Sequence, residues 1–228
     1  MDKALTGPRN PSGSNFHFSK IDEIPQDQGH LLRYRILIPN MTGPPSQVYR
    51  LSIWRIGSEI KVLRKQVYLN ARGLLMKHLP LPDQQESESL GAEDEVEVEF
   101  VAAHGEPVRF TLVSSDERIE IPGTIVPYPI EGKDANCGIQ ARLGFPEGER
   151  ILVFGAGFRG NTPVPVYVVS EGKSHAVQVT ANELGGFVTI VDPHVEGSDS
   201  GVVKISVDPR ECPVAVEIPW GSGTYQPI

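Results

Sequence analysis

The sequence predicts an all-β protein with two β-sandwich domains in tandem behind a flexible N-terminal arm. Short segments of alternating apolar and polar residues recur along the chain, and Gly and Pro, together roughly a fifth of it, punctuate them. No amphipathic helix separates these segments, as a parallel α/β fold would require. Both halves also close on one phrase, Glu120-Ile121-Pro122-Gly123 and Glu217-Ile218-Pro219-Trp220, as tandem copies of one unit would.

The predicted boundaries are residues 1–30 for the arm, 31–131 for the first sandwich and 132–228 for the second. The arm is polar and rich in Ser, Gly, Asn and Pro, with Phe16 and Phe18 as its only aromatic anchors. Each remaining piece has about 100 residues, the usual size of a β-sandwich.

In the first half, strand-like alternation begins at Leu32, Tyr34, Ile36 and Ile38. A hairpin is predicted to turn at residues 70–73, although part of the run from Val67 to Leu79 has helical spacing. An acidic loop is expected over residues 83–94. The other predicted strands of this half are 49–53, 60–62, 96–100 and 108–112.

In the second half, residues 139–145 and 150–154 are predicted to form a hairpin around the turn 146–149. A second hairpin is predicted between residues 177–180 and 187–191. The remaining predicted strands are 164–169 and 216–220, which match 49–53 and 119–123 of the first half.

The stretch Gly144-Phe145-Pro146-Glu147-Gly148-Glu149-Arg150, followed by Gly157-Phe158, resembles the first hairpin of bacterial Ig-like or fibronectin-III-like domains. The turn between Thr180 and Phe187 is similar to another turn of these modules. The resemblance covers most of residues 137–228 and, through the repeat, residues 31–130 more loosely. It implies tandem Ig-like β-sandwiches and identifies a fold rather than a function.

Charge is distributed very unevenly, within a net charge of −8. Residues 31–80 hold nine basic side chains against one acid, Glu59, whereas residues 81–131 hold thirteen acids against Arg109 and Arg118. Either the basic stretch forms a surface for an anionic partner, or basic and acidic strands pair within one sheet. The acidic chain as a whole speaks against a nucleic-acid partner.

Trp54 is the leading candidate contact residue. Its parity is opposite to that of Leu51 and Ile53, which places it on the outer face of the sheet, unless a bulge turns it into the core. The predicted contact surface for a protein or glycan consists of Trp54, Arg50, Arg55, Arg64 and Lys65.

No catalytic or cofactor site is predicted. Gly155-Ala156-Gly157-Phe158-Arg159-Gly160 matches the dinucleotide-binding pattern, but Pro163 and Pro165 follow where that site needs a helix. Asp192, His194, Glu196 and Asp199 form the only local cluster of acids with a histidine, and a solvated loop explains them better than a metal site. The expected protein is therefore not an enzyme and holds no cofactor and no metal.

The two cysteines, Cys137 and Cys212, fall within the second copy. The resemblance implies that the first and last strands of such a sandwich run side by side, which would allow a disulfide and imply an oxidising compartment. Two reduced cysteines acting as small apolar residues are the alternative.

The function expected from these observations is that of a non-catalytic structural or interaction protein, a subunit of a surface or extracellular assembly that self-associates through its N-terminal arm. The alternatives are a glycan- or protein-binding module that uses the basic face of the first domain, and, more weakly, accessory domains of a larger enzyme. No membrane span is expected. The expected location is extracytoplasmic or at the cell surface; the start of the chain lacks the apolar segment of a secretory signal, so a cytoplasmic location is the alternative.

Overall fold

The computed structural model describes residues 15–26, 29–39, 41, 46–79, 94–144, 148–208, 210 and 212–221. These residues form sixteen β-strands and no α-helix, so the predicted all-β class is confirmed. The chain divides into two compact units. The first holds residues 1–55, 59–102 and 108–125, and the second holds residues 56–58, 103–107 and 126–228.

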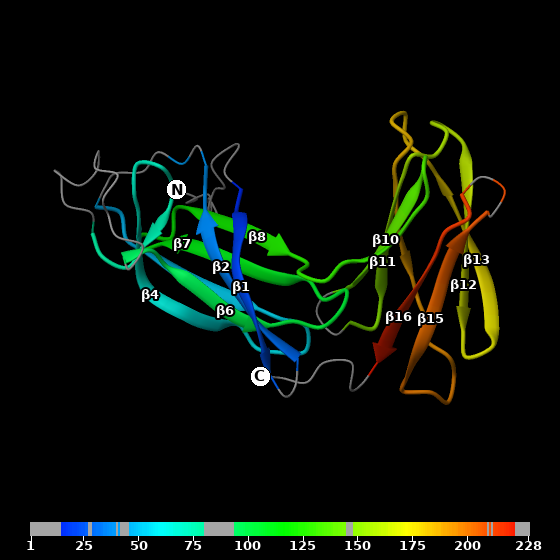
Figure 1. Ribbon diagram of the computed structural model, residues 1–228, viewed down its shortest axis with the longest axis horizontal. Helices are drawn as coiled ribbons and strands as arrows, with labels where there is room; N and C mark the ends of the chain where they lie inside the picture. Colours follow the sequence, from blue (N-terminus) through cyan, green and yellow to red (C-terminus); the bar gives the residue numbers. More distant parts are fainter. Residues whose placement is uncertain are drawn as a thin grey trace, which may run out of the picture. The chain divides into compact units, whose positions relative to one another are not determined.

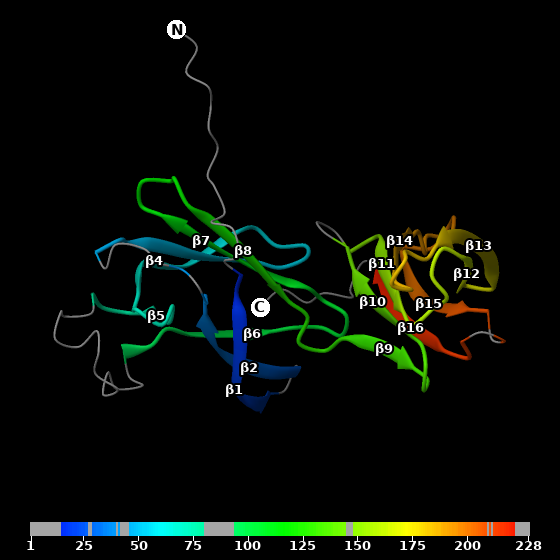
Figure 2. The ribbon, with the colours of Figure 1, turned by 90° about the horizontal axis from the view of Figure 1, so that it is seen from above.

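The first unit contains two antiparallel sheets, with strand orders β1-β2-β6 and β5-β4-β3-β7-β8, and Figure 2 shows them as two layers. Of the predicted acidic loop, all but Asp94 lies outside the described residues. The strands are β1 (His17–Gln26), β2 (Gly29–Leu37), β3 (Tyr49–Trp54), β4 (Lys61–Leu69), β5 (Leu75–Met76), β6 (Glu97–Val101), β7 (Val108–Ser114) and β8 (Glu120–Ile125).

The core of the first unit lies between these sheets. Alternate residues of each strand point inward, as period-2 patterning predicts, and Leu32, Leu51 and Leu112 are fully buried. Phe100 of β6 meets Phe110 of β7 edge to face, with ring centroids 5.6 Å apart. This contact joins the inner face of one sheet to that of the other.

The prediction of a flexible arm over residues 1–30 is wrong for residues 17–26, which form β1 and pair with β2. Phe18 packs on Phe110 at 5.2 Å between centroids, and Phe16 packs on Phe18 at 5.6 Å. The two predicted aromatic anchors therefore attach a strand rather than a loose segment. Residues 1–14 lie outside the described residues.

The second unit also contains two antiparallel sheets, with strand orders β14-β11-β10-β9 and β13-β12-β15-β16, and Figure 1 shows β12 and β15 running beside each other. The strands are β9 (Ile130–Lys133), β10 (Gly138–Leu143), β11 (Ile151–Ala156), β12 (Pro163–Ser170), β13 (Lys173–Thr180), β14 (Phe187–Val191), β15 (Ser200–Val207) and β16 (Ala215–Gly221).

The core of the second unit is built mainly from small β-branched side chains. Ile151, Val153, Val166 and Ile205 are fully buried between the sheets. Trp220 of β16 is also buried, and its indole Nε1–H donates a hydrogen bond to Ser170 Oγ at 3.1 Å. A buried indole therefore has its donor satisfied.

The two units repeat the same set of strand pairings. The pairs of the first unit are β1-β2, β2-β6, β3-β4, β3-β7 and β7-β8. The second unit has the equivalent pairs in the same chain order, which are β10-β11, β11-β14, β12-β13, β12-β15 and β15-β16. The repeated Glu-Ile-Pro phrase falls in β8 and β16, which take the same place in their sheets. The sequence echo therefore corresponds to equivalent strands, while β5 and β9 have no counterpart.

Two predicted hairpins are confirmed and one is wrong. β4 turns at residues 70–73 to pair with β5, and β10 pairs with β11. The third, between 177–180 and 187–191, does not form, because β13 and β14 belong to different sheets. Asn182 explains the crossing, since its side-chain oxygen accepts the backbone N–H groups of Leu184 and Gly186 and holds a compact loop.

The division between the units falls between Ile125 and Val126, whereas the sequence places the boundary after residue 131. β9 accounts for the difference. Its residues Ile130 and Glu131 pair with Ala141 and Gln140 of β10, which assigns them to the second unit.

Candidate functional site

The five residues of the predicted contact surface lie on two neighbouring strands of the first unit. Arg50 and Trp54 belong to β3, Arg55 follows that strand, and Arg64 and Lys65 belong to β4. Arg50, Arg64 and Lys65 are exposed, whereas Trp54 and Arg55 are half-buried. The structure therefore places all five on one region of the second sheet.

Trp54 lies on the outer face of this sheet. Leu51 and Ile53 are buried, and Trp54 has the opposite parity in the same strand. It stands opposite Arg109 of β7, whose guanidinium carbon lies 5.5 Å from the centre of the indole ring. Its role as a contact residue stays a prediction.

Part of the charge asymmetry is explained by pairing inside one sheet. Arg33 of β2 stands opposite Glu99 of β6, and its Nε lies 2.9 Å from Glu99 Oε1. Arg35 of the same strand forms an ion pair with Glu95. The basic and acidic strands of the first sheet thus compensate each other, as one of the two interpretations predicts.

The second sheet of the same unit contains a cavity of about 360 Å³ beside two further cations, Arg50 and Lys65. Trp54, Arg55 and Arg64 do not line it. The lining residues are Val48, Tyr49, Arg50, Val62, Lys65, Ser114, Ser115 and Glu117.

The turn beside this cavity is held by Asp116. Ser114 Oγ donates a hydrogen bond to its carboxylate at 2.6 Å, and the backbone N–H of Arg118 donates another at 3.2 Å. These hydrogen bonds lower the pKa of Asp116 below its ordinary value, the one from Ser114 most strongly. Burial, with a smaller contribution from Asp116, raises the pKa of Tyr49, so the phenol stays neutral at physiological pH.

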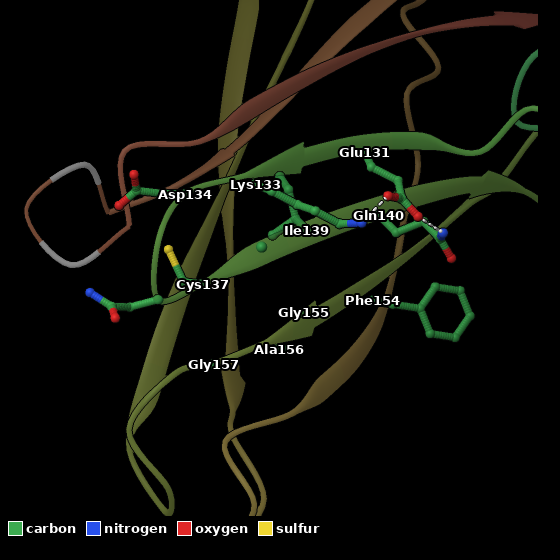
Figure 3. Close-up of a pocket in the computed structure, with 12 residues that line it drawn as sticks. Glu131, Lys133, Asp134, Cys137, Ile139, Gln140, Phe154, Gly155, Ala156 and Gly157 are labelled. Atoms are coloured by element: carbon green, nitrogen blue, oxygen red, sulfur yellow. Dashed lines mark hydrogen bonds and ion pairs between the residues drawn. The ribbon is translucent and has the colours of Figure 1, made fainter.

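A second cavity, of about 440 Å³, opens on the outer side of the β9-β10-β11 region of the second unit (Figure 3). Four of its lining residues, Gly138, Gly155, Ala156 and Gly157, have small side chains or none. The lining residues are Glu131, Lys133, Asp134, Asn136, Cys137, Gly138, Ile139, Gln140, Phe154, Gly155, Ala156 and Gly157.

One edge of this cavity carries a chain of polar contacts. Figure 3 shows the side chains of Lys133 and Gln140 converging on Glu131. Gln140 Nε2 donates to Glu131 Oε1 at 2.6 Å, and Gln140 Oε1 accepts from Arg142 Nε at 2.6 Å. The hydrogen bond from Lys133 is the main cause that lowers the pKa of Glu131, and burial lowers the pKa of Arg142. The charges at this edge are therefore already satisfied by one another.

An apolar strip borders the same cavity on β11 and β14. Leu152 stands opposite Ile190, and Phe154 stands opposite Val188, with all four on the outer face. Val188 and Ile190 keep 62% and 55% of their surface exposed. The Arg142 guanidinium carbon lies over the Phe154 ring, 4.5 Å from its centre.

Sequence reasoning missed this strip. The signal was the uninterrupted run Phe187-Val188-Thr189-Ile190-Val191, in which apolar residues occupy both parities. A strand buried on one face needs only one parity to be apolar, so such a run predicts either burial on both faces or an exposed apolar face.

The glycine-rich motif at residues 155–160 ends β11 and leads directly to β12. A strand therefore follows where a dinucleotide site needs a helix. Gly157 has φ +82°, and a Cβ there would lie 2.0 Å from the carbonyl oxygen of Asn136. The motif serves close packing of two chain segments.

In the predicted acid–histidine cluster after β14, His194 contacts Asp192 and Trp220. The backbone N–H of His194 donates to Asp192 Oδ1 at 2.9 Å, and its ring meets the Trp220 ring edge to face. In the part of the chain that the structure describes, no three His, Cys, Asp or Glu side chains are grouped to hold a metal ion.

Cys137 and Cys212 form a disulfide within the second unit, with Cα atoms 5.9 Å apart and a sequence separation of 75. Both cysteines are buried, just before β10 and just before β16. The crosslink therefore ties the start of β10 in one sheet to the segment that precedes β16 of the other sheet.

Comparison with known proteins found no match, either among protein-family models or among curated proteins. Among the residues described, no helix has the length and apolar character to cross a bilayer.

Proposed function

We propose that this chain is a non-catalytic interaction protein, a subunit of a surface or extracellular assembly, built from two fibronectin-III-like sandwiches. The repeated order of strand pairings supports this assignment, because two antiparallel sheets joined by hairpins and crossings characterise that architecture. The second unit supplies the contact between copies.

The observation that carries the proposal is the apolar strip of Leu152, Phe154, Val188 and Ile190. Exposed large side chains scattered singly are ordinary, but neighbours in register on two strands form a contiguous patch. Burying each such side chain fully stabilises a contact by about 1.5–3 kcal/mol before the costs of association. A patch of this kind is typical of a protein contact.

The partner that fits best is a second copy of the chain. Among the strands that the structure describes, β14 pairs with β11 alone and stands at the end of its sheet, which leaves one side of its backbone as an edge for another strand. A two-fold arrangement that sets β14 against β14 antiparallel extends the sheet and joins the two apolar strips in one step. Residues 17–26 of the predicted N-terminal arm already pair with β2, so the proposed contact between copies uses β14 instead.

The disulfide supports an extracytoplasmic location, since such bonds persist in oxidising compartments. A buried crosslink in a unit of about 100 residues is typical of secreted modules that need support beyond their core.

The test is the solution mass of the chain by light scattering over a concentration series. The wild type is expected to approach a dimer mass as concentration rises, and a Val188→Lys/Ile190→Lys variant to stay monomeric at every concentration. Both side chains are exposed, so the variant keeps its core.

The matched control is Val202→Lys on β15 of the other sheet, where an apolar side chain is 52% exposed. It should associate like the wild type. A wild-type chain that remains monomeric throughout, or equal loss of association in the control, would contradict the proposal.

A further inference from the structure

Two cations, Arg50 and Lys65, line the cavity on β3 and β4 of the first unit, and Lys61 and Arg64 lie on the same strand as Lys65. Arg50, Lys61, Arg64 and Lys65 are exposed. None of the four forms an ion pair or side-chain hydrogen bond with any residue that the structure describes. In the other sheet, by contrast, Arg33 pairs with Glu99. Among the described residues, these four cations of the second sheet thus lack the ion pairing that Arg33 has in the first sheet.

A bulge gathers the cations at the cavity. Tyr49 pairs with Val67 and Leu51 pairs with Arg64, so the single residue between them on β3, Arg50, faces two residues of β4. One of these two is Lys65. Bulges of this kind redirect side chains and are frequent beside binding sites. Arg50 and Lys65 consequently line one cavity from two strands.

The remaining lining suits a small organic anion. Ser115 Oγ accepts a hydrogen bond from Gln47 Nε2 at 3.4 Å, so its own O–H remains able to donate. Val48 and Val62 provide an apolar wall. Among the lining residues, Glu117 offsets one of the two positive charges, so the lining itself has a net charge of +1, while the carboxylate of Asp116 in the adjacent turn is held by Ser114.

We propose that this cavity, with Lys61 and Arg64 on the strand beside it, binds an acidic polysaccharide through one carboxylate- or sulfate-bearing sugar unit. A cavity of about 360 Å³ lies at the lower end of the range for small-ligand pockets, the size for one sugar ring rather than a long segment. Further exposed cations along β4 suit a linear partner that repeats its charge. This site is independent of the apolar strip of the second unit.

The test is titration calorimetry of the full chain with three sugar probes: hyaluronan oligosaccharides, heparin oligosaccharides and neutral dextran. Binding of one acidic sugar and no binding of dextran are expected. The affinity should fall as salt rises, because exposed charges are screened within about 8 Å at physiological ionic strength.

Two variants locate the site. Arg50→Ala/Lys65→Ala should weaken binding at least about tenfold, because it removes two charge-assisted hydrogen bonds. Lys173→Ala/Lys204→Ala removes the same charge from exposed positions of the second unit and should change affinity less than about twofold. Glu117→Gln should tighten binding, a gain that loss of folding cannot produce.

Three outcomes would overturn the proposal: no binding of either acidic sugar, equal loss in both double variants, or tighter binding of poly-glutamate than of any sugar. The last would assign the cavity to an acidic protein segment. Association measured by light scattering should be unchanged in Arg50→Ala/Lys65→Ala, so failure of this site and failure of the proposed assembly are distinguishable.

Discussion

Tyr49 illustrates how one atom affects the stability of the first unit. Its side chain is 1% exposed, and its hydroxyl oxygen is buried without a hydrogen-bond partner among the described residues. An unsatisfied buried hydroxyl costs about 1–3 kcal/mol, so removing it relieves that cost. We expect Tyr49→Phe to leave the free energy of unfolding unchanged or to raise it, as measured by denaturant unfolding followed through Trp54 fluorescence.

The same residue predicts a dependence on alkaline pH. Burial raises the pKa of Tyr49 in the folded state, so the unfolded chain loses the phenolic proton first as pH rises through about 10. The free energy of unfolding is therefore unaffected by this group below a pH of about 10 and falls as pH rises above it. Tyr49→Phe should show a shallower decline than the wild type; an equally steep decline would show that other groups cause it.

The outer position of Trp54 was predictable from sequence, whereas the cavity beside Arg50 was not. The outward position of Trp54 follows from its parity relative to Leu51 and Ile53, and the buried neighbours agree. Pairing of basic with acidic strands was one of two interpretations of the charge pattern, and the sequence alone did not identify Arg33 and Glu99 as partners. The cavity at Arg50 was not predictable, because it depends on a bulge whose position is set by the pairing of β3 with β4.

The segment that begins β1 packs closely against β8. An added Cβ at Gly123 of β8 would lie 2.3 Å from Cγ of Phe16, so the glycine leaves room for that ring. We expect Gly123→Val to destabilise the first unit by about 1–3 kcal/mol through overpacking. Thermal unfolding checks this.

The matched experiment is the double variant Phe16→Ala/Gly123→Val. If the two residues compete for one space, the second substitution should recover part of the loss caused by the first, which a double-mutant cycle measures. Strictly additive effects would contradict the packing argument.

The elements also show why β1 was missed. Phe16 and Phe18 share one parity, but the register of β1 shifts between Lys20 and Asp22, and the later Ile21 and Ile24 are exposed. A bulge in a polar strand erases the alternation that identifies strands. By contrast, buried residues alternate along β7, β12 and β16, and these strands were predicted from sequence.

For the molecule as a whole, each unit carries its own fluorescent reporter, because Trp54 lies in the first and Trp220 in the second. The disulfide closes a loop of 75 residues wholly within the second unit. In the chain-entropy description such a crosslink contributes about 4 kcal/mol. We expect Cys137→Ala/Cys212→Ala to lower the stability of the second unit by that amount.

Denaturant unfolding of the Trp54→Phe and Trp220→Phe backgrounds separates the two transitions. The transition reported by Trp220 should shift to lower denaturant in the cysteine variant, while that reported by Trp54 should stay in place. Equal shifts of both would contradict the confinement of the crosslink to one unit.

The ring of Phe16 also bears on how the first unit is made. It packs against Gly123, which lies 107 positions later in the chain. A ribosome adding about 5–20 residues per second needs roughly 5–20 s to supply that distance. During synthesis the first strand emerges long before its final neighbour exists. Completion of this unit must therefore wait for its last strand, a delay during which a chaperone has time to bind the nascent chain.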